Sequence, residues 1–383
     1  MQEMSGRERL LAALRFQATD RMPWSPLIDD YFLTSLPKQG YAMELVEAMR
    51  YIGIDILERH VPAVKTIYQN GVVYKEEMHG MIKHCTFETP VGTLLETRPT
   101  GISNYVVSKH FATSIEDLRI YQYIAENTDY KVDDAAFKAR DAIIGADGIA
   151  TPSGPMSPIQ ELLQFGCGVE NTVYFMEDHP DEMKTLMQVM HERNLRHYTE
   201  LAKSSAKVIF DYEDTSTTVM SIRQFIHFSV PAIEDYSKII RDSGKLFITH
   251  MCGKLSGFIQ QIGRLNVHGV DSVCPPTTGD LQPWTARDAW GRSKVIIGGI
   301  EPPSLVFMNT RQTLDTIEKI ILTMKDKTGF VLSTGDAVPH GTPIRNMIAI
   351  TKYIQKLGSM SISSAPDRHK LHAVLQETIK ESE

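Results

Sequence analysis

The stretch FITHMCGKL, residues 247–255, places a histidine and a cysteine two positions apart at the end of an apolar run. In an extended segment, side chains two positions apart point the same way, so His250 and Cys252 could both bind one ion. An imidazole together with a thiolate selects zinc over magnesium or calcium. The alternative is a satisfied core histidine beside a cysteine that only packs. A further cysteine at the end of the next predicted strand favours the zinc site.

A tetrahedral zinc site needs three or four such ligands, and a catalytic zinc keeps one position open for substrate. Cys274 ends the next predicted strand and is the expected third ligand. Asp336 ends the last predicted strand and could be a fourth, with Glu301 and Glu213 as competitors. The predicted metal ligands are therefore His250, Cys252, Cys274 and Asp336.

The stretch DYEDTSTT, residues 211–218, offers carboxylates for acid–base chemistry. In a strand, Asp211 and Glu213 share one face, and Asp214 lies on the other. Clustered carboxylates raise one another's pKa, which suits proton transfer, whereas a solvated turn is the alternative. We expect Asp211, Glu213 and Glu301 to act in catalysis.

These residues lie at the ends of β-rich runs that alternate with helix-like stretches in the second half of the chain. The runs are residues 207–212, 245–250, 269–274, 294–299 and 329–334. Their consecutive apolar positions are typical of strands that are buried on both faces of a parallel sheet. In (β/α)8 enzymes the chemistry lies at the C-terminal ends of the strands. The pattern favours an α/β barrel, with a doubly wound sheet as the alternative.

The first half of the chain is less regular. Residues 21–29 could form the first barrel strand. Residues 71–99 alternate β-forming residues with glycine and proline, which predicts an antiparallel meander. We therefore predict one (β/α)8 TIM-barrel domain over residues 1–383, with an N-terminal helical and β-meander elaboration that includes an insertion at residues 65–110.

The composition is that of an ordinary globular protein, with 42% hydrophobic and 23% charged residues. A net charge of −7 argues against nucleic acid as a partner, because such binding calls for a basic patch. There is no uncharged apolar run of about 18 residues, so we expect no membrane span. Four scattered cysteines in 383 residues form no disulfide framework and favour a reducing cytoplasm.

The chain resembles the uroporphyrinogen decarboxylase superfamily, and within it the zinc and corrinoid-dependent methyltransferases. The likeness is carried by RERLLAALRFQATDRMPW, TPVGTLLET, THMCGKL and STGDAVPHGTPIRNM. The first and last of these segments imply the (β/α)8 barrel. The His-x-Cys at residues 250–252 is similar to the zinc motif of the methyltransferase branch. The resemblance places the other ligands on Cys274 and Asp336, where the relatives usually carry an acidic residue and a cysteine respectively.

The resemblance implies an enzyme of the O-demethylase methyltransferase type. It would move a methyl group from a small methylated substrate, such as an aryl methyl ether, to the cobalt of a corrinoid. The chain has no D-x-H-x-x-G pattern, so cobalamin would arrive on a separate corrinoid protein or free. The oligomeric state stays open, with a homodimer among the candidates.

Three alternatives remain at this point. One is methyl transfer from the corrinoid to a thiol, and another is a non-catalytic member with structural zinc or none. The third is a decarboxylase. Relatives that decarboxylate uroporphyrinogen carry an arginine-rich segment after the first strand. Here the corresponding stretch is SPLIDDYF, residues 25–32, with two aspartates and no arginine, which argues against the decarboxylase.

Overall fold

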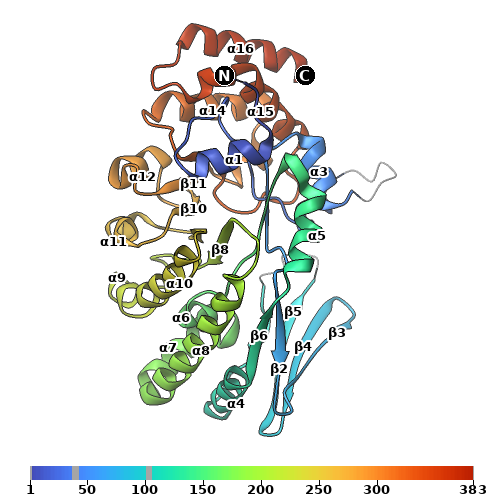
Figure 1. The fold of residues 1–383 in the computed structure, drawn as a ribbon, viewed down its shortest axis with the longest axis vertical. Helices are drawn as coiled ribbons and strands as arrows, with labels where there is room; N and C mark the ends of the chain where they lie inside the picture. Colours follow the sequence, from blue (N-terminus) through green and yellow to red (C-terminus); the bar gives the residue numbers. More distant parts are fainter. Residues whose placement is uncertain (1, 37–42, 101–105, 383) are drawn as a thin grey trace.

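A parallel five-stranded sheet forms the centre of the computed structural model, which describes residues 2–36, 43–100 and 106–382 (Figure 1). The spatial order is β12-β11-β10-β9-β8, so each strand lies beside its neighbour in sequence. The strands are β8 (Val208–Tyr212), β9 (Leu246–His250), β10 (Gly269–Val273), β11 (Val295–Ile300) and β12 (Phe330–Thr334). Every residue of the five strands is buried, as their consecutive apolar positions require. The predicted α/β class with a parallel sheet is confirmed.

A second parallel pair of strands forms a separate two-stranded sheet. It consists of β1 (Ile56–Arg59) and β7 (Gly148–Thr151). Just beyond β7, Ser153 forms a parallel bridge with Phe210 of β8. At the other edge, Trp24 forms a parallel bridge with Leu332 of β12, and the backbone N–H of Asp55 donates to the carbonyl of Trp24 at 2.9 Å. Parallel hydrogen bonding therefore continues from each edge of the five-stranded sheet toward the β1–β7 pair.

Helices alternate with these strands and cover the outer side of the sheet (Figure 1). The helices of the first half are α1 (Gly6–Leu14), α2 (Asp30–Leu33), α3 (Leu45–Ile52), α4 (Ile115–Glu126), α5 (Asp134–Ile144), α6 (Pro158–Glu161), α7 (Gly168–Asp178) and α8 (Pro180–Leu201). Those of the second half are α9 (Ile222–Gln224), α10 (Val230–Asp242), α11 (Ile259–Arg264), α12 (Pro283–Trp290), α13 (Ser304–Phe307), α14 (Thr310–Thr323), α15 (Ile344–Leu357) and α16 (Arg368–Ser382). Several begin at a capping box that satisfies free backbone N–H groups, as Ser5 and Glu8 do for α1.

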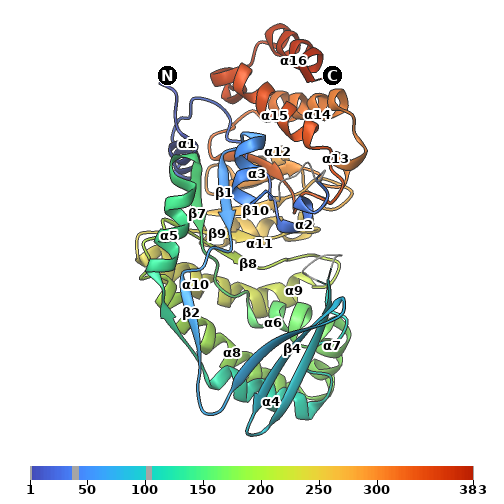
Figure 2. The same cartoon turned by 90° about the vertical axis from the view of Figure 1, so that its right-hand side faces the viewer.

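Two antiparallel elements lie beside α4 and α8, apart from the parallel sheet (Figure 2). A meander joins β3 (Val73–His79), β4 (Ile82–Thr89) and β5 (Gly92–Pro99), and β2 (Val64–Tyr68) pairs with β6 (Thr128–Val132). The division of the chain into one domain with an insertion at residues 65–110 stays a prediction.

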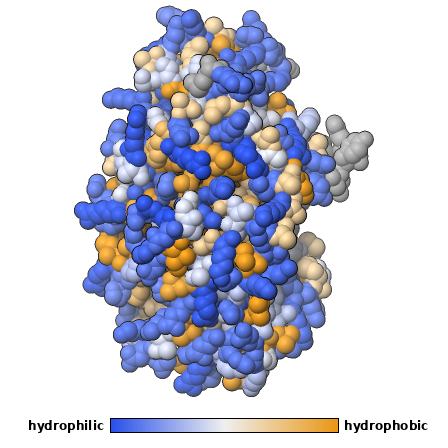
Figure 3. All heavy atoms as spheres, in the orientation of Figure 1, coloured by the Kyte–Doolittle hydropathy of each residue, from blue (hydrophilic) through white to orange (hydrophobic). Residues whose placement is uncertain are grey.

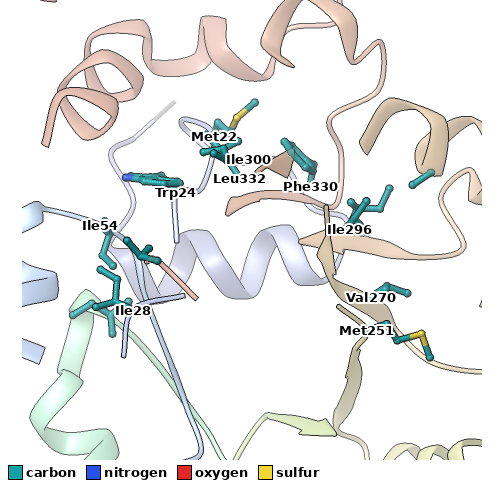
Figure 4. Close-up of a cluster of buried hydrophobic side chains, with 14 of the residues drawn as sticks. Met22, Trp24, Ile28, Ile54, Met251, Val270, Ile296, Ile300, Phe330 and Leu332 are labelled. Carbon is teal, nitrogen blue, oxygen red and sulfur yellow. The ribbon is translucent and has the colours of Figure 1, made fainter. Parts of the chain in front are cut away.

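Alternate residues of the parallel strands pack into two different cores, as a period of two requires. Phe210 and Ile248 belong to an inner cluster, together with Leu10 and Leu14 of α1. Their neighbours in sequence belong to an outer cluster between the sheet and the helices, which Figure 4 shows around Val270, Ile296 and Leu332. Met251 also lies in the outer cluster (Figure 4). His250 and Cys252, on either side of Met251, therefore face away from the outer cluster.

The surface in the view of Figure 3 is mostly hydrophilic, with apolar side chains scattered over it. None of the helices in the described part of the chain combines the length and the apolar character that a transmembrane span requires.

Candidate metal centre

Three side chains that can bind a metal meet just beyond the C-terminal ends of β8 and β9. They are Asp214, His250 and Cys252, whose ligand atoms all lie within 4.8 Å of one another. Asp214 Oδ1 lies 3.3 Å from Cys252 Sγ and 3.6 Å from His250 Nε2. His250 is buried, whereas Asp214 and Cys252 are partly exposed. A carboxylate, an imidazole and a thiol are donors that zinc accepts, and partial exposure leaves room for a further ligand.

A second carboxylate orients the histidine of this group. His250 Nδ1 lies 2.9 Å from Oδ2 of Asp271, which is in β10. Asp271 is held in turn by Arg59 at the end of β1, with Nη2 at 3.0 Å from Oδ1 and Nε at 3.2 Å from Oδ2. Since Nδ1 is engaged, Nε2 faces Asp214 and is the nitrogen available to a metal. Metal-binding histidines commonly have such a carboxylate on their other nitrogen.

The charges of Arg59, Asp271 and His250 determine which of these groups are ionised. Burial acts to raise the pKa of Asp271, but the charge of Arg59 and the hydrogen bond of His250 outweigh it and bring the pKa to about 2. Burial acts to lower the pKa of His250, but the hydrogen bond and charge of Asp271 outweigh it, so this pKa is raised. An ionised Asp271 therefore keeps a proton on Nδ1.

The thiol of Cys252 differs from a free cysteine. Burial, and then the negative charge of Asp214, raise the pKa of Cys252 well above its usual range. A bound cation reverses this effect, because a coordinated thiol gives up its proton. Cys252 is therefore suited to binding a divalent metal and, without one, is poorly suited to act as a nucleophile at neutral pH.

Three features position Asp214. Its backbone is in the left-handed region, with φ of 40°, which turns the chain sharply at the end of β8. Its N–H and that of Glu213 donate to the carbonyl of His250 at 3.2 Å and 2.8 Å, which ties the two strand ends together. Gln164 Nε2 donates to Asp214 Oδ2 at 2.7 Å. Gln164 lies in a π-helical turn, Leu162–Gly166, a feature that is frequent at functional sites.

The other predicted ligands lie outside this group of three. Asp336 is close enough to affect the pKa values of both His250 and Cys252, and its Oδ1 accepts from the N–H of Ala337 at 2.7 Å. Cys274 is fully buried, and its Sγ lies 3.4 Å from the carbonyl oxygen of Pro275. The structure thus brings together His250 and Cys252 but adds Asp214, and the roles of Cys274 and Asp336 stay predictions.

Two of the predicted acid–base residues, Asp211 and Glu213, are buried away from the group of three. Asp211 and Glu213 are fully buried on the face of β8 opposite to Tyr212 and Asp214. Glu213 accepts from the N–H and hydroxyl of Ser157 at 2.8 Å and 2.5 Å, and burial raises its pKa to about 7 although these bonds oppose the shift. Burial, and then the charge of Glu213, raise the pKa of Asp211 well above its usual range. The catalytic roles of both residues stay predictions.

Glu301 lies at the end of β11 and also has partners of its own. Its Oε2 accepts from the backbone N–H of Ser304 at 2.7 Å, in the first turn of α13, and its Oε1 accepts from the hydroxyl of Thr278 at 2.8 Å. These hydrogen bonds connect Glu301 to the segments that follow β10 and β11. Its catalytic role stays a prediction.

Sequence reasoning gave no role to Asp271, Arg59 or Gln164 and did not count Asp214 among the ligands. For Asp271 a signal was available, because a carboxylate inside a strand that is buried on both faces needs a partner. The other contacts join segments far apart in sequence, such as Arg59 with Asp271 and Gln164 with Asp214. The spacing of residues along the chain cannot predict such contacts between distant segments.

A cavity of about 510 Å³ reaches the candidate metal centre. Asp214 and Tyr212 line it at the strand ends, and the ring of Tyr212 stacks between those of His60 and His250, with centroids at 4.0 Å and 4.7 Å. Aromatic side chains from β2, β3, β4, β6, α4 and the π-helical turn form much of the remaining wall, among them Tyr68, Tyr74, Phe87, Tyr121, Tyr130 and Phe165. The size and the aromatic walls suit a small organic molecule.

A larger hollow of about 880 Å³ lies near the starts of β1 and β7. Ion pairs such as Arg9 with Asp20 line it, and none of the strand-end residues described above does. The smaller, aromatic cavity is therefore the one of these two that lies at the end of the strands that carries the metal-binding side chains.

Comparisons with known proteins place this arrangement in a family. The sequence profile described as "Uroporphyrinogen decarboxylase (URO-D)" matches residues 142–357, which is more than half of the chain. A solved structure described as a methyltransferase from Methanosarcina mazei superposes with a TM-score of 0.58 and 14% identity, over 98% of this chain and 100% of that one, which is a likeness of fold.

A D-psicose 3-epimerase with D-tagatose from Clostridium cellulolyticum H10 matches with a TM-score of only 0.32 and 12% identity, over 65% of this chain and 83% of that one. No curated protein matches the sequence. The profile match decides the assignment, because it covers the strands that carry the three candidate ligands. The chain belongs to the uroporphyrinogen decarboxylase (URO-D) family.

Proposed function

We propose that this protein is a zinc-dependent methyltransferase. It moves a methyl group from a small methylated substrate, such as an aryl methyl ether, to the cobalt of a corrinoid that a separate protein carries. The observation that carries the proposal is the group of Asp214, His250 and Cys252, because Asp214 belongs both to this group and to the wall of the aromatic cavity. The resemblance to the methyltransferase branch and the likeness of fold to a methyltransferase from Methanosarcina mazei support it.

Asp214, His250 and Cys252 would hold the zinc, and their donor atoms fit it. One oxygen, one nitrogen and one sulfur ligand leave a position for substrate, as a catalytic site requires. When bound there, zinc supplies Lewis acidity toward the heteroatom that carries the methyl group. Asp336 is the candidate for a further, labile ligand that substrate would replace, since it is close enough to affect the pKa values of both His250 and Cys252.

The remaining residues orient the ligands and the substrate. Asp271 keeps the proton on Nδ1 of His250, so Nε2 stays available as a lone-pair donor. Gln164 binds Oδ2 of Asp214, which leaves Oδ1 directed toward Cys252. Tyr212 and the other aromatic side chains bind the substrate ring and displace water from it. We propose Asp214, rather than Asp211 or Glu213, as the carboxylate that takes part in the reaction.

The size of the cavity supports a corrinoid that stays on its own protein. At about 510 Å³ it has room for one small substrate but not for a corrinoid macrocycle with its side chains as well. The cobalt therefore has to approach from outside, at the open end of the strand-end site. The partner in this proposal is a corrinoid-carrying protein.

We also propose that the parallel strands close into a (β/α)8 barrel, within a single domain over residues 1–383 that contains an insertion at residues 65–110. The β1–β7 pair, the five-stranded sheet and the segment around Trp24 supply eight strand positions in all. The bridges of Ser153 to Phe210 and of Trp24 to Leu332 support closure on both sides. A closed barrel gathers the strand ends around one mouth, where such enzymes carry their chemistry.

The main rival is decarboxylation of a polycarboxylate, which the family's description suggests. Such a substrate needs free positive charge in its binding site. The two arginines that line the cavity, Arg98 and Arg193, each pair with a carboxylate, Glu96 and Glu161 respectively. Neither pair offers an uncompensated positive charge, so we favour methyl transfer.

The test is a methyl-transfer assay with zinc-loaded protein, cob(I)alamin and a panel of methoxylated aromatics. The proposal predicts that methylcob(III)alamin forms, seen in the visible spectrum, and that the demethylated phenol appears in equal amount. Protein carrying His250→Ala is the control and should show at most a trace of this activity. Release of carbon dioxide from uroporphyrinogen without any methyl transfer would overturn the proposal.

A further inference from the structure

We propose that Arg193 determines which substrates enter the cavity, by donating hydrogen bonds to an uncharged carbonyl oxygen. The substrate class is then a small methoxylated aromatic ring that also bears a ketone, aldehyde, ester or amide. This inference rests on the proposed function, since it names the chemical group that the same cavity recognises. The test below measures binding, so it can fail independently of methyl transfer.

Arg193, on α8, is a buried cation, and one of its two terminal nitrogens has no hydrogen-bond partner among the described residues. It is 9% exposed and lines the cavity. Its Nη2 binds Glu161 and also lies 2.8 Å from Oδ1 of Asn194, which accepts from Nε at 3.1 Å as well. Its Nη1 makes no hydrogen bond to any described residue, yet it is not among the atoms that the protein fully encloses. Nη1 is therefore open to whatever occupies the cavity.

The surroundings of Nη1 favour a ligand that brings an acceptor oxygen. Tyr121 and Tyr130 line the same part of the cavity, and both are close enough to Arg193 for their pKa values to depend on its charge. The hydroxyl of Tyr121 already donates to Oε1 of Glu161 at 2.9 Å. Water in the open cavity can accept from Nη1, so the cost arises when a ligand displaces that water: a purely apolar ring leaves the donor without an acceptor, whereas a ligand oxygen replaces the lost hydrogen bond.

The charge of the cavity decides between a neutral and an anionic acceptor. Its lining contains two arginines, Arg98 and Arg193, against three carboxylates, Glu96, Glu161 and Asp214. Each arginine is paired, with Arg98 Nε at 2.5 Å from Oε1 of Glu96. At the Arg193 end of the cavity, away from the candidate metal centre, a substrate carboxylate would thus meet no excess of positive charge and would lose its hydration. A carbonyl oxygen accepts the same hydrogen bond without that cost.

Arg193 and the candidate metal centre face one cavity. Arg193 comes from α8, and Asp214 follows β8, so they approach it from different elements. A ring held among the tyrosines can place its carbonyl against Arg193 while its methoxy group lies toward Asp214. Arg193 would then set the orientation of the substrate as well as its identity.

The experiment compares three probes that differ at one position, by isothermal titration calorimetry with wild-type protein. They are 4-methoxyacetophenone, with a carbonyl, 4-ethylanisole, without one, and 4-methoxybenzoate, with a carboxylate. We expect the ketone to bind about tenfold or more tightly than 4-ethylanisole, because the hydrogen bond involves a charged donor. We expect the benzoate to bind less tightly than the ketone.

Two variants test the residue. Arg193→Lys keeps a positive charge beside Glu161 but has no second arm, so the preference for the ketone should fall to about one while 4-ethylanisole still binds. Arg119→Lys, at an exposed position on α4, is the matched control and should keep the preference. If Arg193→Lys does not fold, the double variant R193M/E161L removes both charges together and gives the same test.

Three results would overturn the inference. They are an unchanged preference in a folded Arg193 variant, tightest binding of the benzoate to wild type, and no binding of any probe. Retention of the expected preference in a protein that transfers no methyl group would contradict the proposed function and leave this inference standing.

Discussion

His250 and Asp271 occupy opposed positions in the register of β9 and β10, and His250 Nδ1 lies 2.9 Å from Asp271 Oδ2. The contact is therefore set by two neighbouring strands of the parallel sheet and not by a mobile loop. Arg59 holds the far side of Asp271 from a third strand, β1. This relationship fixes the direction of the imidazole before any metal arrives, which is what a metal ligand needs.

The first prediction concerns this contact. Asp271→Asn removes the negative charge that keeps the proton on Nδ1, so zinc should bind about 10- to 100-fold more weakly. Competition between the protein and a fluorescent chelator measures the affinity. Asp288→Asn, an exposed position on α12, is the control and should bind zinc like wild type. Equal affinity in the Asp271 variant would show that the carboxylate has only a packing role.

Gln164 provides the second prediction. Gln164→Leu keeps the size of the side chain but removes the hydrogen bond to Oδ2 of Asp214. Asp214 should then lose its fixed orientation, and zinc affinity should fall by about tenfold. Chelator competition is again the measurement, with thermal unfolding to check the fold. A loss of stability with unchanged zinc affinity would count against a positioning role.

The third prediction separates the two outlying ligand candidates. Cys274→Ser should keep one zinc per chain, because Cys274 is not part of the group whose ligand atoms lie within 4.8 Å of one another. Asp336→Asn should lower the affinity, because Asp336 acts on both His250 and Cys252. Zinc content after dialysis measures both. Loss of zinc from the Cys274 variant would restore the thiol as a ligand.

The fourth prediction concerns stability and pH. Burial acts to raise the pKa of Asp20, but the hydrogen bond of Arg9 and others bring it to about 2, below the usual 3.8. Because the folded pKa is the lower one, this stabilisation is present above about pH 4 and is lost as the pH falls toward 2. Asp20→Asn should lower the free energy of unfolding by about 2 kcal/mol near pH 7.

Urea unfolding at several pH values checks this. The difference between wild type and the Asp20 variant should shrink as the pH falls below about 4, because the wild-type carboxylate then becomes neutral as well. A difference that stays constant with pH would mean that the ion pair with Arg9 is not its source.

The sequence predicted those features that depend on a single strand, such as its burial and the direction of its side chains. Consecutive apolar runs located the five buried strands, and the two-residue spacing put His250 and Cys252 on the same side of β9 and its extension. It also separated Asp214 from Asp211 correctly, since the two face opposite sides of the strand.

What the sequence could not supply was contact between distant segments. Gln164 reaches Asp214 from a π-helical turn, and the three-dimensional path of that turn follows from how α6 and α7 pack. Likewise, Arg59 and Asp271 are 212 positions apart in the chain. The walls of the cavity come from the meander and α4, and periodicity says nothing about which of their faces meet the strand ends.

The most direct test of the account is zinc per chain, measured by elemental analysis on wild type beside Asp214→Ala, His250→Ala and Cys252→Ala. Exposed Asp288→Ala is the control, and circular dichroism shows whether each variant is folded. The account predicts about one zinc per chain in wild type and the control, and loss of most of it in each of the three folded variants. A folded wild type that takes up no zinc even when it is supplied, or variants that keep it, would contradict the metal centre proposed for Asp214, His250 and Cys252.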